Sequence, residues 1–353
     1  MLLEQYPERE RRPFRKIVCQ QVGLGSLTDN DRLRRADLAI WGTIGLIGLT
    51  VIAATFCTPF RIEWHSFLAP VSCGVLIAAA GWFYRSVRNE PRLAAVLIAT
   101  SQIIAFAAVG APLSYLAARS GFPLQDALFD SWDRTWLRLD WSSLMQVVAE
   151  RPNLRLVLLL AYSSFAVQTV TTVFSLGVAG RFARLTTFIV AFIATTLITI
   201  AVSAFLPAVG PWVFLDLHPA MANGFLPTSS TSWPVFLGLR DGTFHTINGM
   251  NSEGIITFPS LHAALGILFA AALWRVRGIK WAALVLNTLM LVATPAYGSH
   301  YFVDVIAGVL LAALCWIAAA RWFGADQAAA DDVAADSRDR AGTVAAGPFI
   351  AQA

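Results

Sequence analysis

Three side chains beside two short polar segments carry the strongest chemical signal in this sequence. His262 follows Pro259-Ser260-Leu261 at the start of one apolar stretch, and His300 and Asp304 stand four residues apart at the start of another. Residues i and i+4 of a helix lie on the same face, so the Asp304 carboxylate can orient the His300 ring. With a second histidine as general acid, the set predicts nucleophilic catalysis.

Two other roles are open to the same side chains. Each histidine could simply bond a backbone carbonyl at a helix end. Alternatively, His262, His300 and Asp304 could hold a metal ion, as two imidazoles and one carboxylate do elsewhere. Metal sites that act on phosphate usually carry more carboxylates, and Glu253 is the one obvious addition. We therefore expect a site without metal.

The composition places these residues in a membrane protein. Hydrophobic residues make up 57% of the 353-residue chain and charged residues only 14%, whereas about a quarter of a soluble domain is charged. We predict an all-α fold, a polytopic transmembrane helical bundle, because helices satisfy their own backbone hydrogen bonds in lipid. The four cysteines show no zinc-like spacing, and no Gly-rich nucleotide motif is present. We expect the bilayer as a partner and no nucleic acid.

About eight apolar segments are expected to cross the membrane. The sixth is short, and its assignment depends on the helix start at Pro259-Ser260 and the basic stop at Arg275 and Arg277. The predicted spans are about 38–57, 66–84, 93–118, 154–178, 184–207, 260–274, 280–297 and 301–323.

Lys and Arg positions predict the orientation of these spans. Basic residues gather in the N-terminal arm and after the second, fourth and sixth spans, so this side is expected to be cytoplasmic, with both termini. Outside, the loop 208–259 has one basic residue, Arg240, and the loop 119–153 mixes both charges. The three candidate catalytic side chains then share one level at the outer face of the cell membrane. We expect 208–259 to cap them, and the Trp-rich 124–141 to lie along the interface.

The two motifs resemble a known family. Pro259-Ser260-Leu261-His262 and Gly298-Ser299-His300-Tyr301-Phe302-Val303-Asp304 are similar to the second and third motifs of the type 2 phosphatidic acid phosphatase superfamily. The His-Tyr-Phe-x-Asp form is most similar to its branch of inositol phosphorylceramide synthases, or inositolphosphotransferase-like enzymes. The resemblance covers about residues 90–323. It implies a six-helix core, a lipid phosphate substrate and no metal or other cofactor.

The resemblance also implies a role for each residue. His300 would attack phosphorus and form a phosphohistidine, and Asp304 would orient the imidazole and stabilise its positive charge. His262 would protonate the leaving oxygen and then activate water or an alcohol. Ser260 and the amides at the helix start would bind phosphate oxygens.

The chain departs from the family in its cations. The usual first motif, Lys-x6-Arg-Pro, is absent, and Ala293 and Thr294 stand where phosphatases have a Ser-Arg pair. We expect Arg240, with help from His245, to bind the phosphate instead. The alternative is a loop arginine paired with Asp241. The missing pair is more typical of the phosphotransferase-like branch.

These observations predict an integral-membrane lipid phosphatase or phosphotransferase. A metal-dependent lipid hydrolase is the first alternative. A lipid transporter is the second, although the spans have few of the intramembrane charges that it would need. The expected regions are a cytoplasmic basic arm (1–36), two N-terminal transmembrane helices (37–90), the catalytic membrane domain (91–323) and a disordered tail (324–353).

Overall fold

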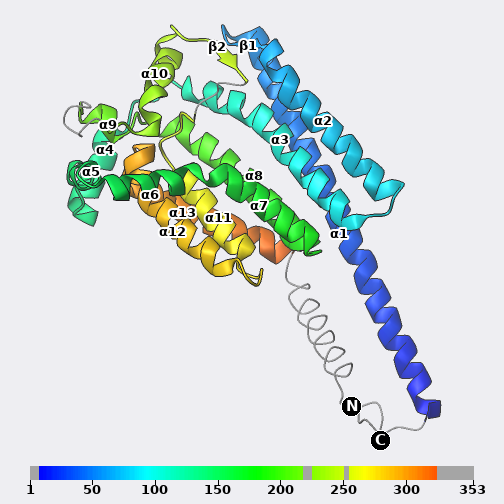
Figure 1. Cartoon of the computed structure of the whole chain (residues 1–353). Coiled ribbons are helices and arrows are strands. Elements are labelled where there is room, and N and C mark those ends of the chain that lie inside the picture. The colour runs from blue at the N-terminus through cyan, green and yellow to red at the C-terminus, as the bar shows by residue number, and fades with distance from the viewer. Residues whose placement is uncertain (1–7, 218–224, 250–253, 324–353) are drawn as a thin grey trace, which may run out of the picture.

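The computed structural model describes residues 8–217, 225–249 and 254–323 (Figure 1). The predicted disordered tail and Glu253 lie outside these ranges. Within these ranges the fold is a helical bundle with one pair of three-residue strands, which confirms the predicted all-α polytopic class. The long helices are α1 (Glu8–Cys57), α2 (Trp64–Ser86), α3 (Pro91–Ala118), α6 (Pro152–Ser163), α7 (Phe165–Val178), α8 (Phe182–Phe205), α11 (Leu261–Leu273), α12 (Lys280–Gly298) and α13 (Phe302–Phe323).

Six helices in the described residues are long and apolar enough to cross a membrane, which makes the protein multi-pass. The predicted fourth span is the pair α6 and α7, which bend by 47° at Ser164 and can count as a seventh. The predicted sixth span, α11, has 13 residues and is about 20 Å long, whereas a bilayer core is about 30 Å thick. Helix α11 therefore reaches only part of the way across.

Helix α11 lies at the centre of the bundle and contacts α7, α8, α12 and α13. It is apolar on all sides, and eight of its residues from Ala263 to Leu273 are buried, as expected for a helix without a solvent face. At Gly308 a β-carbon would collide with the Ser260 carbonyl. The glycine thus lets α13 lie against the start of α11, which brings the two sequence motifs together.

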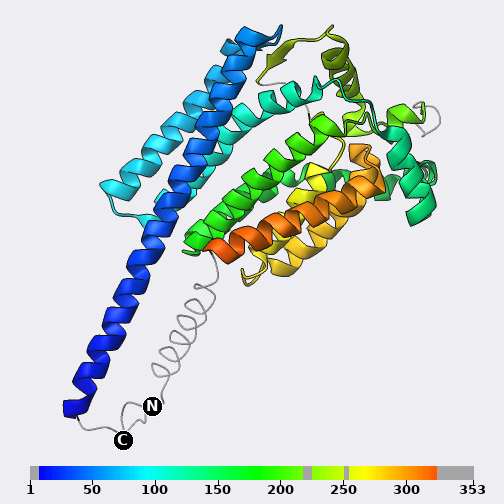
Figure 2. The ribbon, with the colours of Figure 1, turned by 180° about the vertical axis from the view of Figure 1, so that it is seen from behind.

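The short elements gather at one end of the bundle, and the C-terminal end of α13 and the N-terminal half of α1 lie at the other (Figures 1 and 2). The short elements are β1 (Arg61–Glu63), α4 (Asp126–Trp132), the π-helical turn η1 (Asp133–Leu137), α5 (Trp141–Ala149), α9 (Pro211–Phe214), the 3-10 turn η3 (Thr228–Thr231), α10 (Trp233–Asp241) and β2 (Thr246–Asn248). β1 and β2 pair in parallel, with Ile62 opposite Ile247. This pair ties the α1–α2 connection to the loop that leads into α11.

Candidate active site

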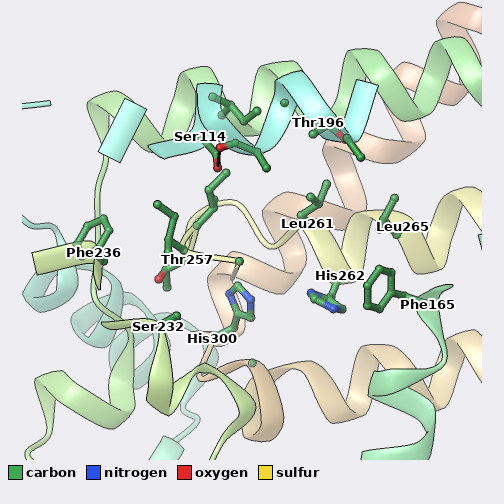
Figure 3. Close-up of a pocket in the computed structure, with 18 of the residues that line it drawn as sticks. Ser114, Phe165, Thr196, Ser232, Phe236, Thr257, Leu261, His262, Leu265 and His300 are labelled. Atoms are coloured by element: carbon green, nitrogen blue, oxygen red, sulfur yellow. Dashed lines mark hydrogen bonds between the residues drawn. The ribbon is translucent and has the colours of Figure 1, made fainter. Parts of the chain in front are cut away.

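A cavity of about 620 Å³ opens between α3, the α6–α7 bend, α8 and α11. In Figure 3, His262 and His300 lie close together on one side of this cavity, with Ser114 and Thr196 on the other. Figure 3 also shows Phe236 at the opposite end of the cavity from Phe165. The structure therefore places both candidate histidines in one cavity, although 38 residues separate them in sequence.

His300 and Asp304 form the pair that their spacing predicts. The His300 Nδ1 lies 3.3 Å from the Asp304 Oδ2, and the same oxygen accepts a 2.9 Å hydrogen bond from the Tyr301 amide. Asp304 is fully buried and His300 is 4% exposed. The loop between α12 and α13 directs His300 toward the cavity, because Ser299 ends α12 in the left-handed conformation with φ of 52°.

The environment of His300 keeps its ring neutral. Burial lowers the pKa of His300 to about 3, and the nearby His262 contributes to the same shift. At neutral pH the imidazole therefore has a lone pair available, which a nucleophile requires. Within the described residues the second Asp304 oxygen, Oδ1, has no hydrogen-bond partner, so the carboxylate has acceptor capacity left when His300 becomes positively charged.

His262 is held by aromatic rings from the α6–α7 bend. Its ring stacks on Tyr162 with 4.2 Å between centroids and meets the edge of Phe165 at 5.2 Å. The Tyr162 hydroxyl lies 3.4 Å from the His262 Nδ1. Tyr162 was not among the predicted site residues, because a tyrosine inside an apolar span is usually a packing residue. Tyr162 lies just before the bend at Ser164, and the residues on both sides of this bend line the cavity.

Ser260 lies at the start of α11 and has a structural task. Its hydroxyl is fully buried and accepts from the Ala263 amide at 3.4 Å, which is the N-cap position of the helix. The Ser260 amide donates to the Asp304 carbonyl at 3.0 Å and so fixes α11 to α13. Leu261 and His262, the next two residues, do line the cavity. The predicted phosphate contact of Ser260 stays a prediction that this geometry does not favour.

Arg240 is also engaged elsewhere. Its guanidinium donates to the Ser120 carbonyl at 2.8 Å and the Phe122 carbonyl at 2.5 Å, after the end of α3. The backbone of His245 pairs with Arg61 beside the strands. Neither side chain is among the cavity-lining residues, and none of the described residues that line the cavity is a lysine, arginine or acid. The predicted phosphate-binding role of both residues is untested, and this structure does not bring them to the histidines.

Side chains that could bind a metal ion do not gather in the part of the chain that the structure describes. Across residues 8–217, 225–249 and 254–323, no group of three His, Cys, Asp or Glu side chains is close enough to hold a metal. What the geometry offers instead is a neutral imidazole paired with a carboxylate, a second imidazole held by tyrosine, and hydroxyls around an apolar cavity. That arrangement suits transfer of a group through a histidine nucleophile.

One comparison with known proteins identifies the chain. A family model described as the PAP2 superfamily matches residues 131–318, which is more than half of the chain and includes all three candidate catalytic residues. Searches of curated proteins and of solved structures give no match. With its membrane helices, the match supports a membrane enzyme of the phosphatase or phosphotransferase type. The chain belongs to the PAP2 superfamily.

Proposed function

We propose that this protein transfers phosphoryl groups of lipid-linked phosphates at the outer membrane face through a phosphohistidine at His300. The observation that carries the proposal is the buried His300–Asp304 pair beside His262 on one cavity wall. The acceptor is water in a phosphatase or an alcohol in a phosphotransferase, including the inositol type. Both reactions share the first step.

In the first step the His300 Nε2 attacks phosphorus, because Nδ1 faces Asp304. The phosphorus–nitrogen bond forms as the phosphorus–oxygen bond to the leaving group breaks, and His262 gives that oxygen a proton. Asp304 stabilises the positive charge that the His300 ring gains. In the second step His262 takes the proton of water or alcohol, whose oxygen attacks phosphorus and releases neutral His300.

The cavity walls support an amphiphilic substrate. Away from the histidines the cavity is lined by apolar side chains of three helices, namely Phe106, Phe192, Ile200 and Leu265, which suit an acyl or prenyl chain. Near the histidines, the Tyr162 hydroxyl and the N-terminal end of α11 can meet phosphate oxygens. A helix N-terminus favours anions through its amides and its dipole.

The outer-face assignment rests on the basic residues of the sequence. They gather in the N-terminal part of α1 and in the turns after α2, α7 and α11, at the end of the bundle away from the short elements (Figure 1). We propose that this end is cytoplasmic and that the cavity, with its wall from residues 231–236 and 254–257, opens toward the outer leaflet. Helices α1 and α2 then form an N-terminal unit beside the catalytic domain.

The test is product analysis with purified protein in proteoliposomes. Phosphatidic acid as a monoester, and phosphatidylglycerol and phosphatidylinositol as diesters, are supplied with and without chelator and with and without inositol or glycerol. Mass spectrometry identifies the products, and acid-labile, base-stable phosphate should be trapped on the wild type but not on His300→Ala. Equal activity in His300→Ala would overturn the proposal. Loss on chelation with rescue by one divalent ion would favour the metal-dependent alternative.

A further inference from the structure

Asp133 binds the first turn of the catalytic helix α13 from a distant part of the chain. Its Oδ2 accepts from the Phe302 amide at 2.7 Å and its Oδ1 from the Val303 amide at 2.9 Å, across 169 and 170 residues of sequence. The first amides of a helix have no partner within the helix, and a cap usually comes from the residue just before it. Here both oxygens of one carboxylate from η1 serve as the cap, directly before Asp304.

Asp126, two turns earlier in the same segment, holds the other side of this loop. Its Oδ1 accepts from the Tyr301 hydroxyl and the Gly210 amide, both at 2.9 Å, and its Oδ2 accepts from the Val209 amide at 3.1 Å. Ser299 is fixed as well, because its hydroxyl accepts from the Trp212 amide at 3.0 Å. Residues 299 and 301 to 303, on both sides of His300, are thus each hydrogen-bonded to Asp126, Asp133 or Trp212.

The burial of these two carboxylates calls for a reason beyond a simple cap. Asp126 and Asp133 are each 2% exposed. Burial raises the pKa of Asp133 to about 6 and also raises the pKa of Asp126. A buried charge is costly unless several hydrogen bonds compensate it, and a serine or asparagine would cap α13 without that cost. A carboxylate, however, can accept from two amides with its two oxygens and therefore holds two consecutive residues of the chain at once.

We propose that Asp133, supported by Asp126, is a positioning residue that holds the 299–304 loop so that His300 meets phosphorus in line. Neither residue lines the cavity, so each acts through the backbone. The proposal rests on the proposed function, because only a nucleophile needs its ring held this closely. Displacement of a reacting group by about 1 Å can cost about 100-fold in rate.

The experiment compares Asp133→Asn with Asp130→Asn. Both changes remove one negative charge from the same segment, but Asp130 pairs with Arg134 and contacts no amide of α13. We expect Asp133→Asn to lower kcat and the single-turnover rate of phosphoenzyme formation by about 10- to 100-fold, with KM within about twofold. Asp130→Asn should stay within about twofold of wild type.

A second readout does not depend on activity. Hydrogen–deuterium exchange of peptides covering 299–305 should be faster in Asp133→Asn than in Asp130→Asn, because asparagine replaces one of the two accepting oxygens by an NH₂ group, which cannot accept from a backbone amide. If Asp133→Asn does not fold, Tyr301→Phe replaces it, since this change removes only the bond to Asp126. We expect it to lower kcat by about 3- to 10-fold relative to wild type, the size of one lost hydrogen bond, and kcat within about twofold of wild type would overturn the positioning role.

The outcomes separate this inference from the proposed function. Faster exchange with kcat unchanged would overturn the positioning role and leave a structural cap. An equal fall of kcat in Asp130→Asn would overturn it in favour of a general effect of charge. Wild-type activity in His300→Ala would refute the proposed function itself, and a positioning role for Asp133 toward His300 would fall with it.

Discussion

Replacement of Asp304 by asparagine should isolate the electrostatic contribution of the carboxylate. Asparagine has the same shape, and the Tyr301 amide, which donates to Oδ2 at 2.9 Å, favours the orientation that keeps an oxygen facing His300. In the opposite orientation two N–H donors would face each other. The His300 tautomer should therefore survive in Asp304→Asn, and the negative charge is what the substitution removes.

The size of the effect follows from the distance between the two charges. The His300 Nδ1 lies 3.3 Å from the Asp304 Oδ2, and with both charges spread over several atoms the mean separation is about 4 Å. At an effective dielectric constant of about 20, this corresponds to about 4 kcal/mol. Because His300 gains its positive charge only as phosphorus is attacked, the loss should appear as an approximately 10³-fold fall in rate.

The assay is rapid-quench measurement of phosphoenzyme formation at saturating substrate, with kcat measured in parallel. Folding is followed by circular dichroism and thermal denaturation. We expect some destabilisation, because the new amide NH₂ replaces an oxygen that has no partner among the described residues. Asp130→Asn is the control for loss of one acidic residue. A fall of less than about tenfold in folded Asp304→Asn would refute the assignment of Asp304 as the stabiliser of the His300 cation.

Three further predictions test the surroundings of the histidines and the topology. Tyr162→Phe keeps the stacked ring but removes the hydroxyl 3.4 Å from the His262 Nδ1; kcat should fall by about 3- to 30-fold, and unchanged steady-state kinetics would mean that the hydroxyl does not orient His262. Arg240→Ala removes two hydrogen bonds to carbonyls and should lower the Tm by a few degrees while kcat of the folded enzyme stays within about threefold; a large fall in kcat at unchanged Tm would instead support phosphate binding by Arg240. Thr243 and Ser86 are both exposed. In a background without native cysteines, Thr243→Cys should react with an impermeant thiol reagent in intact cells, and Ser86→Cys should react only after permeabilisation. The reverse pattern would show that the proposed orientation is wrong.

The fold class and the central pair of the site could be predicted from the sequence, because both depend on neighbours along the chain. Membrane helices appear as contiguous apolar segments, and all eight predicted segments are helical in the structure. The His300–Asp304 contact follows from the helical period once a helix start is placed near them. The sequence did not show that the fourth segment bends by 47° or that α11 has only 13 residues, because packing against neighbouring helices sets both features.

The partners of the remaining polar groups were decided only by the tertiary structure. Arg240, predicted to bind phosphate because other cations are absent from its loop, donates to two carbonyls beyond the end of α3, which its sequence position did not indicate. Tyr162 reaches His262 across 100 residues, and Asp133 reaches the Phe302 amide across 169. Composition determines which segments enter the membrane, and the helical period determines which side chains of a segment share a helix face, since solvent and backbone geometry act on each segment by itself. A buried charge, in contrast, must pair with whichever amide or carbonyl the packed helices leave unsatisfied, and that choice exists only in the folded chain.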